Sequence, residues 1–351
     1  MHPSITIAGR EIGRDHLPYV IAELSANHNG DLSQALRIID AAAEAGADAL
    51  KIQTYTADTL TIESNAPDFQ IKGGLWDGRT LYDLYQQAYT PWEWHSILFA
   101  HAKRRGITIF STPFDATAAD LLDELGAPAY KIASFEAIDL PLIRYVAAKG
   151  QPMIISTGMA NVEEIEDAVT AAREGGCQDL ALLHCVSGYP APAKDYALAT
   201  LTDMQQRFGV PAGLSDHTLS NVTAIASVAL GATIIEKHFT LDRNGGGPDD
   251  SFSLEPDDLA QLCRDARTAW EAAGSVDYGL KSSERSNTVF RRSLYAVQDI
   301  PAGSVITTEH VRSIRPGYGL APKHLDSVIG SRAKVDIPRA TAILWALLDI
   351  D

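Results

Sequence analysis

Eight short apolar runs recur along most of the sequence, and this repetition constrains the fold more than any other feature. The runs are YVIAELS from Tyr19, ALKIQT from Ala49, ITIFST from Ile107, AYKIAS from Ala129, PMIISTG from Pro152, LALLHC from Leu180, PAGLSD from Pro211 and TIIEKHF from Thr233. Such near-continuous apolar runs are typical of parallel strands that are buried on both faces. Segments with helical periodicity separate them, for example residues 33–47 and 161–176. This alternation predicts an α/β protein with a (β/α)₈ TIM barrel, and a doubly wound open sheet is the alternative.

The pattern changes toward the C-terminus. Residues 278–290 are polar and mixed, and residues 291–351 contain short β-rich pieces interrupted by IPAG, RPGYG and IPRA. We therefore predict a barrel domain over residues 1–277, a linker over 278–290 and a small β-rich domain over 291–351. A domain of about 60 residues has little core of its own, so we expect it to dock on another domain or subunit.

The connection between the second and third apolar runs is unusually long. It contains Gly73, Gly74, Trp76 and Gly78. Loops of this size in compact domains are often functional, so this segment is a candidate lid.

Composition excludes several classes of function. The formal net charge is −16, whereas nucleic-acid binding needs a basic face, so we expect no nucleic-acid partner. No apolar run reaches the length of a membrane span, and the first residues show no basic segment followed by an apolar one. The three cysteines are odd in number and lack metal-type spacing. These features predict a cytoplasmic protein without a membrane partner.

Polar side chains cluster where the apolar runs end. They are Glu23, Asn27, Lys51, Gln53, Thr112, Lys131, Ser134, Glu136, Ser156, Ser187, Tyr189, Ser215, His217, Glu236 and His238. In a TIM barrel the carboxyl ends of all strands meet at one face, where catalytic groups lie. The sequence therefore predicts one polar site at the mouth of the barrel.

Two lysines at this mouth indicate a phosphate site. Lys51 and Lys131 lie between apolar neighbours at equivalent places in the repeat. Buried lysine without a partner is rare, and an ammonium beside hydroxyl donors suits a phosphate. The hydroxyls expected around the two lysines come from Thr112, Ser134, Ser156 and Ser215.

Two histidines end successive runs and indicate a metal site. His217 directly follows the seventh run and His238 is the second-last residue of the eighth, so the barrel should bring them together. A pair of imidazoles with the remaining positions open suits a divalent ion such as Mn²⁺, Mg²⁺ or Co²⁺ that acts as a Lewis acid. Glu23 has two interpretations, a partner for Lys51 or an acid–base group. Arg315 lies in a glycine-rich turn before a proline, which presents it either to a ligand or to solvent.

Nine motifs carry a resemblance to a known family. They are ELSANHNG, GADALKIQT, STPFD, LGAPAYKIAS, ISTGM, HCVSGYP, GLSDHT, EKHFT and GGPDDSFSLEP. In this order along the barrel they resemble the sialic acid synthases, which condense phosphoenolpyruvate with amino sugars to make nonulosonic acids. The tail is similar to the antifreeze-like, or SAF, domain of those enzymes. ELSANHNG, ASFEAIDLPLI and the segment from Lys72 to His95 are most similar to the pseudaminic acid branch.

The resemblance implies a transferase that joins phosphoenolpyruvate to 2,4-diacetamido-2,4,6-trideoxy-L-altrose. In this numbering it assigns phosphoenolpyruvate to Lys51, Thr112, Lys131, Ser134, Ser156 and Ser215, the metal to His217 and His238, the sugar to Gln53, Tyr189, Asp249 and Arg315, and proton transfer to Glu23 and Glu136. It also implies a domain-swapped homodimer in which Arg315 reaches a neighbour's sugar.

Alternatives remain open at this point. The sugar specificity of N-acetylneuraminic or legionaminic acid synthases would use the same chemistry. A Schiff-base aldolase would use Lys51 or Lys131 as its nucleophile. A carbohydrate-binding or ice-binding protein would use the tail alone and leaves the polar strand ends without a role.

Overall fold

The computed structural model describes residues 2–349, which fall into two compact units divided after Gly274. Among these residues, eight parallel strands close into a barrel in the order β10-β3-β4-β5-β6-β7-β8-β9. The strands are β3 (Tyr19–Glu23), β4 (Ala49–Thr54), β5 (Thr108–Pro113), β6 (Tyr130–Ile132), β7 (Met153–Ser156), β8 (Leu180–Cys185), β9 (Ala212–Ser215) and β10 (Ile234–His238). Seven of the eight predicted apolar runs contain one strand each, and the run from Ile107 stops one residue before the end of β5. The TIM barrel is confirmed, and the open sheet is wrong.

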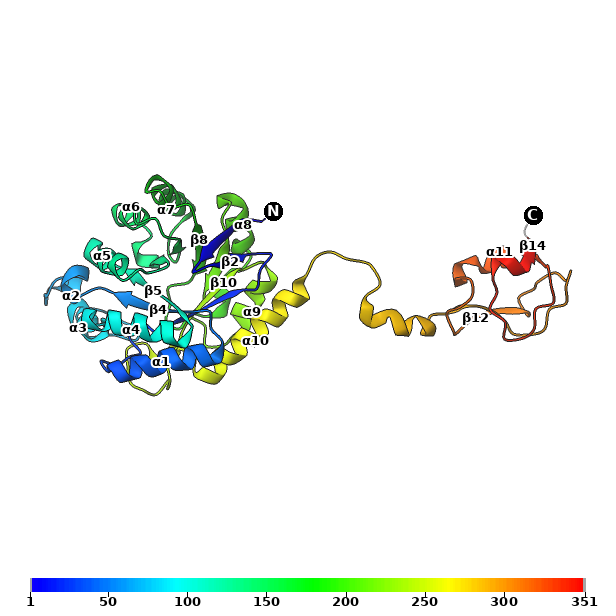
Figure 1. The fold of residues 1–351 in the computed structure, drawn as a ribbon, viewed down its shortest axis with the longest axis horizontal. Helices are drawn as coiled ribbons and strands as arrows, with labels where there is room; N and C mark the ends of the chain where they lie inside the picture. Colours follow the sequence, from blue (N-terminus) through cyan, green and yellow to red (C-terminus); the bar gives the residue numbers. More distant parts are fainter. Residues whose placement is uncertain (1, 350–351) are drawn as a thin grey trace. The chain divides into compact units, whose positions relative to one another are not determined.

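A helix follows each strand and packs on the outside of the barrel (Figure 1). These helices are α1 (Leu32–Ala45), α4 (Trp92–Arg105), α5 (Ala116–Glu124), α6 (Leu140–Ala147), α7 (Val162–Glu174), α8 (Thr200–Phe208), α9 (Val222–Ala229) and α10 (Pro256–Ala273). Local sequence sets their ends. Asp31 accepts from the Ser33 amide at the start of α1, and Gly46 ends it with a left-handed φ of 87°. Asn161 and Glu164 form a capping box on α7.

An N-terminal hairpin closes the other end of the barrel. Its strands, β1 (Ser4–Ile7) and β2 (Arg10–Gly13), pair antiparallel across a turn in which Ala8 and Gly9 both have positive φ. Ile5, Ile7 and Ile12 are buried in one apolar cluster with residues of the barrel interior. The hairpin therefore seals the amino ends of the strands and leaves the carboxyl ends as the open face.

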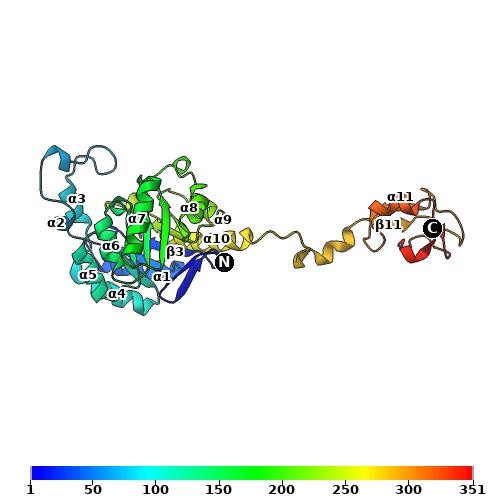
Figure 2. The same ribbon diagram turned by 90° about the horizontal axis from the view of Figure 1, so that it is seen from above.

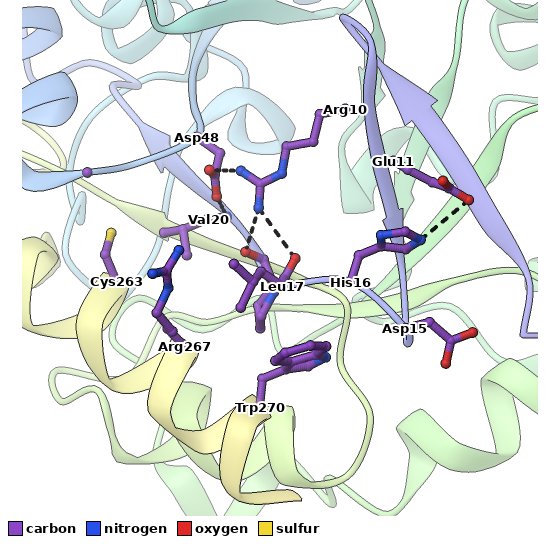
Figure 3. A pocket seen from close by; sticks show the side chains of 12 residues that line it. Arg10, Glu11, Asp15, His16, Leu17, Val20, Asp48, Cys263, Arg267 and Trp270 are labelled. Atoms are coloured by element: carbon purple, nitrogen blue, oxygen red, sulfur yellow. Dashed lines mark hydrogen bonds and ion pairs between the residues drawn. The ribbon is translucent and has the colours of Figure 1, made fainter. Parts of the chain in front are cut away.

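A cavity of about 510 Å³ lies beside this hairpin, at the amino ends of β3 and β4 (Figure 3). Arg10 there pairs with Asp48 and donates to the carbonyls of Leu17 and Pro18. Its lining includes none of the predicted site residues. Its position and its ion pair indicate a structural role, because they tie the hairpin to the first barrel strands.

The long connection after β4 folds as two short helices with a loop between them. They are α2 (Ala57–Leu60) and α3 (Leu81–Ala88), and the loop projects from the barrel beside them (Figure 2). Gly73, Gly74 and Gly78 all have positive φ, which explains why this loop contains glycine at those places.

The second unit has a small β-rich core. Its strands β11 (Ser293–Ala296) and β12 (Val311–Ile314) pair antiparallel, as do β13 (Arg332–Ala333) and β14 (Leu348–Asp349), and α11 spans Leu325–Val328. Leu294, Ile300, Ile306, Ile337 and Ile343 are among its buried residues. No helix within residues 2–349 is long and apolar enough to cross a membrane.

Candidate active site

Strand geometry explains why polar residues line the mouth. Side chains two residues apart on a strand face the same way. The barrel interior contains an apolar layer that includes Ile21, Ala49, Phe110, Ala129, Ile154, Leu183 and Ile234. Two residues further along the same strands stand Glu23, Lys51, Thr112, Lys131, Ser156, Cys185 and Glu236, all of them buried. The interior therefore changes from apolar to polar within one layer, at the carboxyl ends of the strands.

Four buried charges form the centre of this polar layer. Lys51 Nζ lies 2.8 Å from Glu23 Oε2 and 3.7 Å from Glu236 Oε1. Lys131 Nζ lies 3.7 Å from the same Glu236 oxygen. Parallel pairing places Lys51 opposite Glu23, so the barrel register itself brings this pair together. The two carboxylates balance the two ammonium groups, as buried charges require.

The surroundings bias the protonation of these groups. Burial raises the pKa of Glu23. Burial also acts to raise the pKa of Glu236, but the charges of Lys131 and Lys51 outweigh it and hold that pKa below its usual value. Burial lowers the pKa of Lys131, whereas for Lys51 the two glutamates overcome burial and raise the pKa. A proton is thus held most easily on Glu23, and its uptake would leave the cluster with positive charge that attracts an anion.

Two of the four predicted hydroxyls contact the lysines directly, and a third contacts Glu236. Lys51 Nζ lies 3.3 Å from Thr112 Oγ1, and Lys131 Nζ lies 2.6 Å from Ser156 Oγ. Ser215 Oγ donates to Glu236 at 3.3 Å. These distances bring five of the six predicted phosphoenolpyruvate residues into one set of contacts.

Ser134, the sixth, lies beside Gly158. We call these six predicted phosphoenolpyruvate residues the cradle. The Gly158 amide donates to Ser134 Oγ at 3.1 Å. A Cβ at position 158 would stand 2.3 Å from Ser187 Oγ and 2.8 Å from Ser134 Oγ. Ser187 Oγ is buried without a hydrogen-bond partner among the described residues, so it is available to a ligand.

For the phosphoenolpyruvate that the sequence resemblance implies, Gly158→Ala is therefore expected to raise the KM by about 10-fold or more, because the new methyl group displaces two hydroxyls that have ligand-binding capacity. Gly158 does not have positive φ, so the barrel should fold normally. Initial rates at varied phosphoenolpyruvate check this prediction. Gly279→Ala is the control, because Gly279 is exposed, lacks positive φ, and its new Cβ would meet only the Asp277 side chain.

The predicted metal pair is also brought together. The imidazole centroids of His217 and His238 lie 5.4 Å apart. His217 Nδ1 is 2.8 Å from the Val186 carbonyl, which holds the ring and leaves Nε2 for a ligand. His238 Nδ1 is buried without a partner in the described part of the chain, and burial holds the pKa of His238 well below its usual range. A neutral, unpartnered imidazole is a suitable metal ligand.

By themselves the two imidazoles would form only part of a metal's ligand set. No cluster of three or more histidine, cysteine, aspartate or glutamate side chains with metal-binding geometry occurs within residues 2–349. The donors present fit a divalent ion that keeps positions for water and substrate.

A cavity of about 370 Å³ opens beside the charged cluster. Gln53, Tyr189, Asp249, Glu136 and His238 contribute to its lining. Gln53 Nε2 donates to Glu23 Oε1 at 3.1 Å, which connects the cavity directly to the charged cluster. Three of the four predicted sugar contacts therefore share one cavity with one histidine and one glutamate.

A second connection holds Asp249 at the cavity. Ser25 Oγ donates to Asp249 Oδ2 at 2.5 Å, and Gln53 Nε2 donates to Ser25 Oγ at 3.0 Å. Burial raises the pKa of Glu136, another lining residue, to about 7, and its Oε2 has no hydrogen-bond partner in the described structure. This carboxyl group is thus able to hold or release a proton near neutral pH.

Arg315 is the predicted site residue that the barrel does not contain. It follows β12 in the second unit and is exposed. Sequence reasoning noted Glu236 and Ser187 as strand-end residues but gave neither a role, and it missed Ser25 and Cys185. Glu236 could have been recognised, because it occupies the same inward position on β10 as Lys51 does on β4.

Comparisons with known proteins agree with this geometry. The NeuB family matches residues 38–278, and the SAF domain matches residues 291–349. The chain is 44% identical to a pseudaminic acid synthase of Campylobacter jejuni, over 94% of this chain and 96% of that protein. It is 37% identical to an N,N'-diacetyllegionaminic acid synthase of the same species, over 90% of this chain and 95% of that protein.

A solved structure shows the same similarity in three dimensions. The N-acetylneuraminic acid synthetase of Leptospira borgpetersenii superposes with a TM-score of 0.74 at 32% sequence identity, and the match covers 82% of this chain and 95% of that one.

Proposed function

The chain belongs to the NeuB family, and from this premise we propose that it condenses phosphoenolpyruvate with 2,4-diacetamido-2,4,6-trideoxy-L-altrose to give pseudaminic acid and phosphate. The observation that carries the proposal is the buried Glu23–Lys51–Glu236–Lys131 cluster, with its hydroxyls, beside a cavity that is large enough for a sugar. The cluster suits a small anion with a phosphate and a carboxylate.

The reaction forms one C–C bond and breaks one C–O bond. C3 of phosphoenolpyruvate attacks the aldehyde carbon of the open-chain sugar, and the aldehyde oxygen takes a proton. Positive charge develops at C2 of the former phosphoenolpyruvate, where a water molecule adds and loses a proton. The new C2 hydroxyl then gives up its proton as the C–O bond to phosphate breaks, and phosphate leaves with that proton, so the products are a nine-carbon 2-keto acid and inorganic phosphate.

The buried residues supply orientation and charge for these steps. Lys51 and Lys131 hold the phosphate and carboxylate and stabilise the departing phosphate, and the hydroxyls of Thr112, Ser134 and Ser156 fix their direction. Ser215 contributes through its hydrogen bond to Glu236, whose buried carboxylate can stabilise positive charge at C2. Gln53, Tyr189 and Asp249 bind the hydroxyl and amide groups of the sugar.

The two imidazoles fit a divalent metal ion, as their free nitrogens indicate. His217 and His238 would hold Mn²⁺, Mg²⁺ or Co²⁺, which supplies Lewis-acid polarisation of the aldehyde when bound.

The two glutamates handle protons in different surroundings. Glu23 touches Lys51 and the charged cluster, where it can take the proton that the adding water loses. Glu136 lines the sugar cavity, where it can donate a proton to the aldehyde oxygen.

The pH dependence of kcat tests the role of Glu136. A proton donor must be protonated, and the pKa of Glu136 is raised to about 7 by burial, so kcat should fall as the pH rises through about 7. Glu136→Gln should lower kcat by about 10²-fold and remove this alkaline limb. Two results would contradict this role of Glu136. One is a Glu136→Gln enzyme whose kcat still falls as the pH rises through about 7, and the other is a wild-type kcat that falls as the pH decreases through about 7. Glu93→Gln on α4, outside the cavity, is the control.

Arg315 gives the basis for a proposed homodimer. In the second unit, Ser293 Oγ donates to the Pro316 carbonyl at 2.6 Å and accepts from the Gly319 amide at 2.9 Å, so the loop after Arg315 is held against β11. A Cβ at Gly319 would stand 2.4 Å from the Leu294 carbonyl, which explains this close approach. A fixed loop with an exposed guanidinium suits contact with the amide or hydroxyl groups of a sugar bound by a second copy.

Mixing two inactive variants tests this arrangement. Arg315→Ala chains have an intact barrel, and Lys131→Ala chains have an intact tail, so a mixed dimer has one complete mouth. With random exchange at equal input about half of the dimers are mixed, and activity should recover to about a quarter of the wild type. No recovery, with subunit exchange confirmed by mass-tagged chains, would rule out a contribution of Arg315 to the partner's mouth. Mixing each variant with itself is the control.

Phosphate release tests the proposed function itself. Purified protein is mixed with phosphoenolpyruvate and a divalent metal ion. Phosphate release should be fast when 2,4-diacetamido-2,4,6-trideoxy-L-altrose is present and slow without a sugar. The same assay is run with N-acetylmannosamine to test the sialic acid alternative, and with the corresponding manno-configured diacetamido sugar to test the legionaminic acid alternative. Faster turnover of either would assign the chain to that specificity, and no sugar-dependent release would reject the condensation.

A further inference from the structure

One wall of the sugar cavity comes from the long insertion after β4. Leu60, Ile71, Trp76, Leu81 and Leu84 line the cavity, and we call them the insertion wall; Tyr85 and Ala88 of α3 line it beside them. Leu84 is 7% exposed and fixed on α3, whose first turn is capped by Thr80. The other side of the cavity carries the polar groups near the charged cluster. The cavity is therefore polar toward the reacting centre and, apart from the Tyr85 hydroxyl, apolar toward the insertion.

Trp76 connects this wall to the rest of the mouth. Its Nε1 donates to the Pro248 carbonyl at 3.1 Å, next to Asp249, and its ring lies 5.8 Å from that of Tyr189. The indole N–H is therefore already used. The other members of the insertion wall are aliphatic, so no side chain of the wall has a hydrogen-bond donor or acceptor left for a ligand.

The proposed reaction determines the orientation of a sugar in this cavity. The aldehyde carbon must lie near the charged cluster, and Gln53, Tyr189 and Asp249 serve the polar groups close to it. The end of the sugar that is remote from the aldehyde then faces the insertion wall. A hydroxyl buried there loses its hydrogen bonds to water without replacement, whereas a methyl group gains apolar contact.

We propose that the insertion wall is the specificity determinant for the remote end of the sugar, and that it selects a terminal methyl group over a terminal hydroxymethyl group. The proposal rests on the proposed condensation and adds the residues that read the sixth carbon. It also gives the long insertion a role in substrate choice.

A matched pair of substrates tests this inference. The two sugars are 2,4-diacetamido-2,4,6-trideoxy-L-altrose and its counterpart with a hydroxyl on C6, compared through kcat/KM for phosphate release. We expect the wild type to prefer the deoxy sugar by about 10- to 100-fold, the range that an apolar pocket reaches against an added hydroxyl. Ile71→Asn should reduce this preference at least about fivefold, because it offers the hydroxyl a partner.

Leu75→Asn is the matched control, since Leu75 lies in the same loop but is 49% exposed and does not line the cavity. The preference is a ratio within one enzyme sample, so partial misfolding of a variant does not change it. A wild type that uses both sugars equally, or equal effects of Ile71→Asn and Leu75→Asn, would overturn the inference and leave the condensation standing. Failure of both sugars to release phosphate would instead reject the proposed function on which the inference rests.

Discussion

Removal of divalent metal ions is expected to lower turnover by about 10³-fold or more, and added Mn²⁺, Mg²⁺ or Co²⁺ should restore it. The reason is the pair of imidazoles at the mouth, His217 and His238, whose centroids lie 5.4 Å apart and of which His238 lines the cavity proposed for the sugar. An enol ether carbon is a modest nucleophile, so the aldehyde needs polarisation. Turnover before and after chelation, with metal content measured in the same samples, checks this prediction. Full activity in metal-free protein would show that the reaction does not need a metal ion.

Substitution of the two histidines tests whether the metal ion binds at His217 and His238. His217→Ala and His238→Ala should each weaken metal binding in a direct titration of Mn²⁺, while the circular dichroism spectrum stays unchanged. His101→Ala is the control, because His101 lies on α4 and pairs with Asp40 on the outside of the barrel. If the control weakens metal binding as much as the site variants do, the metal binds elsewhere.

Lys131→Met is expected to lower kcat/KM for phosphoenolpyruvate by about 10²- to 10³-fold, the loss seen when one charge-stabilising donor is removed from an active site. Its ammonium group touches Ser156 and Glu236 and is buried. The KM for the sugar should change much less. Lys103→Met, an exposed lysine on α4, should have no effect.

The same lysine separates condensation from Schiff-base chemistry. Borohydride treatment with the sugar or with pyruvate should leave the wild-type mass unchanged, since the proposed reaction forms no imine. A covalent adduct on Lys131 or Lys51 would favour the aldolase alternative. An unchanged kcat/KM in the Lys131→Met variant would show that this lysine does not hold phosphoenolpyruvate.

The barrel was predictable because its strands are buried on both faces. The apolar runs indicated strands of a parallel sheet, and their regular alternation with helices favoured a closed barrel over the open sheet. The same geometry made the site predictable. A residue two positions after an interior apolar residue, such as Lys51 after Ala49, necessarily faces the interior one layer higher.

Contacts between distant segments were beyond sequence reasoning. The close approach of Gly158 to Ser134 and Ser187 depends on how three loops meet, and nothing local to Gly158 reveals it. The insertion wall is a similar case, because Trp76 meets Pro248 across the mouth. The β1–β2 hairpin was missed for another reason: its strands are only four residues each, and its partners lie in the barrel interior.

The central claim is that the buried lysine–glutamate cluster joins phosphoenolpyruvate to a sugar aldehyde through a new C–C bond. Phosphoenolpyruvate labelled with ¹³C at C3, incubated with the protein, the metal and the L-altro sugar labelled with ¹³C at C1, tests it most directly. The account predicts a one-bond carbon–carbon coupling in a nine-carbon product, formed in step with phosphate. Free labelled pyruvate with no coupled product would contradict it.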